Sequence, residues 1–132
     1  PTSTPAGTEL AASVIWLGVV YGVAEALLVN VVPMMAAWRA FRGAGLTRSI
    51  RGKIVAAAFT MAANLTVTAA YNLGFPEFRG AEITGPLSGN LLIGAGFVFA
   101  PNPIISIVSH VILHVASVLA GGEGPVNLPP HG

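Results

Sequence analysis

Three long apolar segments with almost no charged residues constrain this sequence more than any other feature. The first, Leu10 to Ala37, contains a single charged residue, Glu25, and the second, Ile54 to Phe75, contains none. The third, Leu87 to Ala120, is also uncharged and is interrupted by Pro101-Asn102-Pro103. About 20 apolar residues are enough for a helix to cross the hydrocarbon core of a bilayer. We therefore expect a chain that folds in lipid rather than in water.

The composition excludes several classes of protein. Only 8% of the 132 residues are charged and 54% are hydrophobic, whereas about 25% of an ordinary soluble domain is charged. A net charge of +1 gives no basic field for nucleic-acid binding. The chain has no cysteine, which excludes disulfide frameworks, iron–sulfur clusters and thiolate zinc sites.

The predicted fold is all-α, a polytopic transmembrane bundle of four helices that forms one domain over residues 1–132. Asn102 followed by Pro103 is a favourable start for a helix, so it divides the third segment in two. The expected helices cover residues 10–37, 54–75, 86–100 and 103–120, with extended tails at 1–8 and 121–132. The third helix is short for a span, so a re-entrant segment is the alternative. Pro33 predicts a bend in the first helix.

The basic residues predict the orientation of this bundle. Five of the six lie between the first two helices: Arg39, Arg42, Arg48, Arg51 and Lys53. Cytoplasmic loops of membrane proteins carry an excess of Lys and Arg. With four spans, the loop at 39–53 is then cytoplasmic and both termini lie outside.

Polar residues inside the apolar helices are the candidate functional residues, because burying them in lipid costs free energy. His110 and His114 lie one helical turn apart, a spacing at which two imidazoles share one metal ion. Glu25, at a similar depth, would complete a set of two histidines and a carboxylate that suits a divalent transition metal. Asn64 and Tyr21 would orient these ligands by hydrogen bonds to the ring nitrogens that do not bind the metal. We predict that the three ligands face one another inside the bundle.

Other interpretations of the same residues stay open. The polar groups could handle a proton or a substrate, or simply bond the helices to one another. Haem or a pigment is a narrower option, since two histidines on one helix cannot clamp both faces of a haem. No catalytic residue is identified, because the chain lacks a Gly-x-Ser-x-Gly elbow, an aspartate pair and a metalloprotease helix.

Gly18, Gly22 and Ala26 form a stripe of small residues along the first helix. Such stripes let helices approach closely in membranes. The stripe predicts a close helix contact and, through it, association with other membrane subunits or with a second copy of the chain.

Several blocks of the sequence resemble a family of uncharacterised bacterial multi-pass membrane proteins. The blocks are Tyr21-Gly22, Ala26-Leu27-Leu28, Pro33, Gly74-Phe75-Pro76-Glu77-Phe78-Arg79-Gly80, Asn102-Pro103, Ser109-His110 with His114, and Leu128-Pro129-Pro130-His131. The resemblance implies a multi-pass protein of the bacterial cytoplasmic (inner) membrane and implies no activity. Two hypotheses follow: a membrane protein with a metal or cofactor site at the histidine pair, or an accessory subunit that packs against a larger membrane complex.

Overall fold

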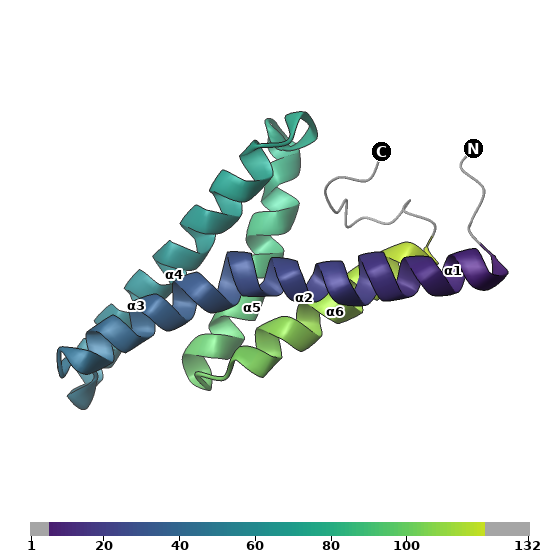
Figure 1. The fold of residues 1–132 in the computed structure, drawn as a ribbon. Coiled ribbons are helices and arrows are strands. Elements are labelled where there is room, and N and C mark those ends of the chain that lie inside the picture. The colour runs from purple at the N-terminus through teal and green to yellow at the C-terminus, as the bar shows by residue number, and fades with distance from the viewer. Residues whose placement is uncertain (1–5, 121–132) are drawn as a thin grey trace.

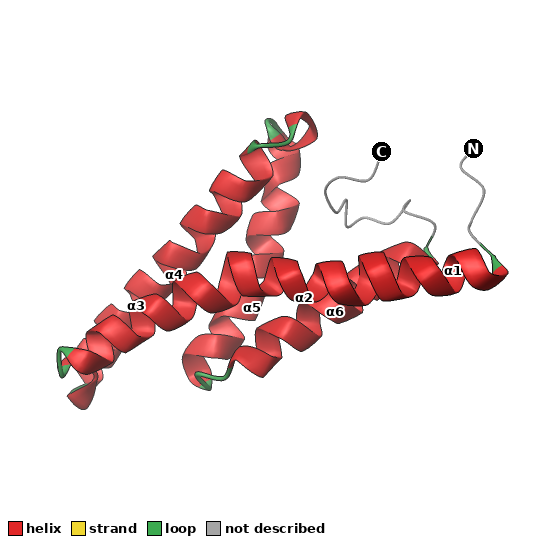
Figure 2. Ribbon diagram, in the orientation of Figure 1, coloured by secondary structure: helices red, strands yellow, loops and turns green. Residues whose placement is uncertain are grey.

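The computed structural model describes residues 6–120, and within this range every regular element is a helix (Figure 2). One continuous helix covers Gly7–Gly43 and contains α1 (Gly7–Ser13), α2 (Gly22–Glu25) and α3 (Val32–Gly43). Two π-helical segments, Val14–Tyr21 and Ala26–Val31, join these three parts. The remaining long helices are α4 (Ile50–Leu73), α5 (Thr84–Phe99) and α6 (Pro103–Leu119). The predicted all-α class is confirmed.

The helix bounds differ from the predicted ones mainly at the first two helices. The first begins at Gly7 and continues to Gly43, so residues 7 and 8, predicted as part of an extended tail, are helical. The second begins at Ile50, because the Ser49 hydroxyl accepts a hydrogen bond from the Gly52 N–H at 3.0 Å and caps the helix. Residues 1–5 of the tail predicted at 1–8, and the whole tail predicted at 121–132, lie outside the described residues.

Two helices, Gly7–Gly43 and Ile50–Leu73, have the length and apolar composition of a membrane span. At a rise of about 1.5 Å per residue, the 16 residues of α5 and the 17 of α6 are about 24 and 26 Å long. Both are slightly shorter than the roughly 30 Å of a typical hydrocarbon core. The count of four spans therefore stays a prediction.

The irregularity predicted at Pro33 is present as the π-helical segment directly before it. Pro33 is within the first two positions of α3, where its missing N–H and its ring disturb the preceding turn. A π-helical turn, with hydrogen bonds from residue i to i+5, accommodates this disturbance. Figure 1 shows that the long helix changes direction between α2 and α3.

The long helix is the axis on which the other helices pack. Its N-terminal half contacts α6, its C-terminal part contacts α4, and α5 packs against both α4 and α6 (Figure 1). The contact with α6 is close: a Cβ atom on Gly22 would lie 3.1 Å from the Val111 Cα, and one on Gly18 would lie 2.7 Å from the Val115 Cγ2. The predicted close approach of the small-residue stripe is confirmed.

This contact lies within the chain. Because α6 covers Gly18 and Gly22, and Ala26 is buried, the stripe is already occupied by a helix of the same molecule. Association with other membrane subunits or with a second copy would use a different face and stays a prediction.

Candidate functional site

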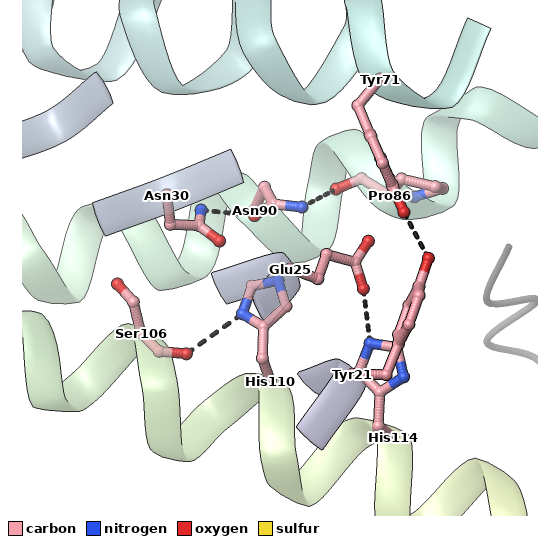
Figure 3. Close-up of polar contacts among 9 residues, drawn as sticks. All are labelled: Tyr21, Glu25, Asn30, Tyr71, Pro86, Asn90, Ser106, His110 and His114. Atoms are coloured by element: carbon pink, nitrogen blue, oxygen red, sulfur yellow. Dashed lines mark hydrogen bonds and ion pairs between the residues drawn. The ribbon is translucent and has the colours of Figure 1, made fainter. Parts of the chain in front are cut away.

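A buried polar contact between two helices that are far apart in the sequence joins Glu25 and His114. Glu25 ends α2 and His114 lies on α6, and the His114 Nε2 is 2.5 Å from the Glu25 Oε2 (Figure 3). Their side chains are only 8% and 4% exposed. The close approach of the two helices at Gly22 allows these side chains to meet. The predicted meeting of the histidine pair with Glu25 is therefore confirmed for His114.

Two tyrosines border this pair. The Tyr21 ring meets the His114 ring edge-on, with 5.2 Å between the ring centroids, a favourable arrangement for aromatic groups. The Tyr21 hydroxyl also forms a hydrogen bond with the Tyr71 hydroxyl of α4 (Figure 3). We call Tyr21, Glu25, Tyr71 and His114 the carboxylate–imidazole cluster. Tyr21 lies beside the site as predicted, whereas the contribution of Tyr71 was not predicted.

His110 bonds to its own helix rather than to Glu25. Its Nδ1 lies 3.1 Å from the Ser106 carbonyl oxygen, and because a carbonyl only accepts, Nδ1 carries a proton. The His110 and His114 rings are 6.4 Å apart, with 25° between their planes. Among residues 6–120, no group of three or more His, Cys, Asp and Glu side chains is placed to hold a metal ion. The metal site at Glu25, His110 and His114 stays a prediction.

A second polar cluster joins the long helix, α4 and α5 through asparagine side chains. The Asn30 Nδ2 donates to the Asn64 Oδ1 at 2.6 Å and to the Asn90 Oδ1 at 2.5 Å. The Asn64 Nδ2 donates to the backbone carbonyl of Asn90 at 3.0 Å, and the Asn90 Nδ2 donates to the backbone carbonyl of Pro86 at 3.1 Å. We call Asn30, Asn64 and Asn90 the amide cluster. Asn64 thus bonds to the long helix and to α5 rather than to a histidine.

The face of α4 that carries Asn64 is buried along its length. Its members, spaced four residues apart, are Thr60, Asn64, Thr68 and Asn72. The Thr68 hydroxyl donates to the Asn64 carbonyl at 2.9 Å, and the Asn72 Nδ2 donates to the Thr68 carbonyl at 2.8 Å. This polar face therefore points inward, and two of its members form side-chain hydrogen bonds within α4 itself.

Asn30 and Asn90 were missed by sequence reasoning. Asn30 lies four residues after Ala26 and continues the buried face formed by Gly18, Gly22 and Ala26. The sequence carried this signal, because the small-residue stripe reaches Asn30 at the same spacing. For Asn90, the only signal was an isolated amide within an apolar run.

Three buried side-chain oxygens have no hydrogen-bond partner among the described residues. They are the Asn30 Oδ1, the Thr60 Oγ1 and the Ser106 Oγ, and all three residues are 0% exposed. Buried polar atoms are nearly always hydrogen-bonded in folded proteins. The carboxylate–imidazole cluster contains no such atom. The core around Asn30, Thr60 and Ser106 therefore differs from that cluster in having buried oxygens without a protein partner.

No family model, curated protein or solved structure matches the chain in the three comparisons. Its function is therefore argued from the geometry of the two clusters.

Proposed function

We propose that this chain is a small multi-pass protein of the bacterial cytoplasmic membrane that binds and exchanges a proton at the Glu25–His114 pair. The contact that carries the proposal is the 2.5 Å separation between the His114 Nε2 and the Glu25 Oε2. An ionisable residue inside a membrane helix is costly, and where it occurs it is typically paired and functional.

The chemistry of the pair suits a proton. One proton shared between an imidazole and a carboxylate keeps the pair neutral, which lowers its cost in an apolar core. Binding a second proton, or losing the first, changes the net charge of the pair by one. The other titratable side chains around it are Tyr21, Tyr71 and His110. A change of charge at the pair therefore takes place beside three further side chains that can donate or accept hydrogen bonds.

In the proposed topology, all four long helices cross the membrane. The loop at 39–53 faces the cytoplasm because it holds five of the six basic residues. The helices alternate in direction, so the loop between α4 and α5 and both termini lie outside. Tyr21 and Tyr71 then lie on the outer side of the core, and Asn30 lies closer to the cytoplasm than Glu25 does.

This topology is tested by labelling single cysteines, since the natural chain contains none. A thiol reagent that does not cross the membrane should label Ala44→Cys only from the cytoplasmic side. It should label Ala81→Cys, in the loop after α4, only from the outside. The reverse pattern would overturn the orientation.

Proton binding is tested by infrared spectroscopy of the protein in lipid nanodiscs as a function of pH. We expect a carboxyl C=O band that changes with pH, disappears in Glu25→Gln and shifts in His114→Asn. Glu9→Gln is the matched control, because Glu9 is exposed at the start of α1. Identical spectra from the parent and Glu25→Gln at every pH would overturn the proposal.

The metal site and the accessory subunit are the other two hypotheses, and a separate measurement distinguishes each of them from the proposal. Metal analysis of the purified protein should find a stoichiometric divalent metal if the site exists, and the metal should be lost in His110→Ala and His114→Ala. An accessory subunit should co-purify with a larger membrane complex whether or not Glu25 is present. The proton proposal expects neither outcome.

A further inference from the structure

We propose that internal water molecules bind in the core between Asn30, Thr60 and Ser106, on the cytoplasmic side of the Glu25–His114 pair. Three buried oxygens without a protein partner carry this inference: the Asn30 Oδ1, the Thr60 Oγ1 and the Ser106 Oγ. No such oxygen is found in the carboxylate–imidazole cluster.

Register places the three oxygens in the same part of the core. Asn30 bonds to Asn64, and Thr60 lies one helical turn before Asn64 on the same buried face of α4. The α6 helix runs antiparallel to the long helix, since Gly18 faces Val115 and Gly22 faces Val111. Ser106 therefore lies toward the same end as Asn30.

Figure 3 shows Ser106 and Asn30 on the same side of His110, away from His114. The backbone carbonyl of Ser106 also accepts a hydrogen bond from the His110 Nδ1–H. All three oxygens are displaced from the Glu25–His114 pair toward the end of the bundle that carries the basic loop.

Water is the ligand that these groups would take. An amide oxygen only accepts, whereas each hydroxyl both donates and accepts. A buried water typically makes about three hydrogen bonds to otherwise unsatisfied polar groups. No charged side chain is part of the group, so nothing in it would balance the charge of an anion.

Bound water here would place groups that accept and release protons on the cytoplasmic side of the Glu25–His114 pair, an extension that rests on the proposed function. Each water or hydroxyl accepts one proton and releases another, so no covalent bond other than O–H and N–H bonds changes. His110 lies between the two regions: its Nδ1 donates to the Ser106 backbone carbonyl, and its ring centroid is 6.4 Å from that of His114.

The site is tested by water–protein cross-relaxation in isotope-labelled protein held in deuterated detergent. We expect cross-peaks between water and the Asn30 side-chain amide, and none at Thr66, which is exposed on the opposite side of α4. The double variant Ser106→Ala, Thr60→Val should lose the Asn30 cross-peaks. The control Ser109→Ala, Thr66→Val makes the same substitutions on the same two helices and should keep them.

Several outcomes would overturn the inference. They are the absence of cross-peaks at Asn30 in the parent, their survival in the double variant, and their displacement by sodium, which would assign the oxygens to a cation. Ser106→Ala alone, measured in the same way, gives the answer if the double variant does not fold. Water cross-peaks together with a Glu25 that never titrates would contradict the proposed function and leave the water site intact.

Discussion

The two polar clusters of the core differ in how completely their groups are partnered. In the carboxylate–imidazole cluster, the carboxylate, the His114 imidazole and both tyrosine hydroxyls have partners from another helix. In and around the amide cluster, the amides bind three helices together, yet three oxygens have no protein partner. Removing a group from the first region should therefore break a protein contact. Removing one of the three oxygens should instead disturb bound water.

The largest effect is expected from Glu25→Leu. This change leaves the His114 imidazole buried without its partner, and breaking a buried pair in this way costs about 3–5 kcal/mol of unfolding free energy. The double variant Glu25→Leu, His114→Leu should be clearly less destabilised, because no polar group is left unpaired. Unfolding of both variants by a denaturing detergent measures the difference. Equal losses in the two would contradict the pairing.

Gly22→Leu should separate the helices that hold the pair. The Cβ of a side chain at Gly22 would lie 3.1 Å from the Val111 Cα, which is backbone and cannot move aside. Overpacking of this kind costs about 1–3 kcal/mol. Gly89→Leu on α5 is the control, because no atom lies within 4 Å of a Cβ at that position. If Gly22→Leu unfolds like the parent, the close contact with α6 is wrong.

Tyr71→Phe removes the hydrogen bond between α4 and the long helix at the outer side of the core. We expect a loss of about 0.5–1.5 kcal/mol, the net contribution of one hydrogen bond. Tyr21→Phe should cost a similar amount. The double variant should lose little more unfolding free energy than the more destabilised single variant. Fully additive losses in this cycle would mean that the two hydroxyls do not bond to each other.

Ser106→Ala should give the smallest effect, and its sign is informative. If water bonds to the Ser106 hydroxyl, the variant loses up to about 1 kcal/mol, because the ordering of water offsets part of the bond. If the hydroxyl is dry, removing an unsatisfied buried group should be neutral or stabilising. The same unfolding measurement distinguishes these results, and an increase in stability would contradict a hydrated core.

The sequence was sufficient to predict the helices and the orientation of residues that follow α-helical spacing. The uncharged runs predicted all-α structure, and Asn102 was predicted as the cap of α6, where its side chain accepts the Ile104 N–H bond at 2.9 Å. The four-residue spacing of His110 and His114 predicted that both side chains turn inward, and both are buried. These features depend on local geometry, which a sequence encodes directly.

Other features depended on geometry that spacing does not encode. The bonds from Asn30 to Asn64 and Asn90 depend on how three helices meet. The bond between Tyr21 and Tyr71 depends on how the long helix and α4 cross. The start of α4 at Ile50 depends on the Ser49 cap, which places basic residues within the helix. Tertiary packing and caps, rather than hydrophobic periodicity, decided these three features.

The central claim is that Glu25 and His114 share and exchange a proton, and nitrogen-15 NMR of histidine-labelled protein in nanodiscs tests it most directly. The His114 Nε2 resonance should report a hydrogen bond to a carboxylate and change with pH in the parent. In Glu25→Gln that response should be lost or displaced, while Glu9→Gln should reproduce the parent. A His114 resonance that follows the same pH profile in the parent and in Glu25→Gln would contradict the claim.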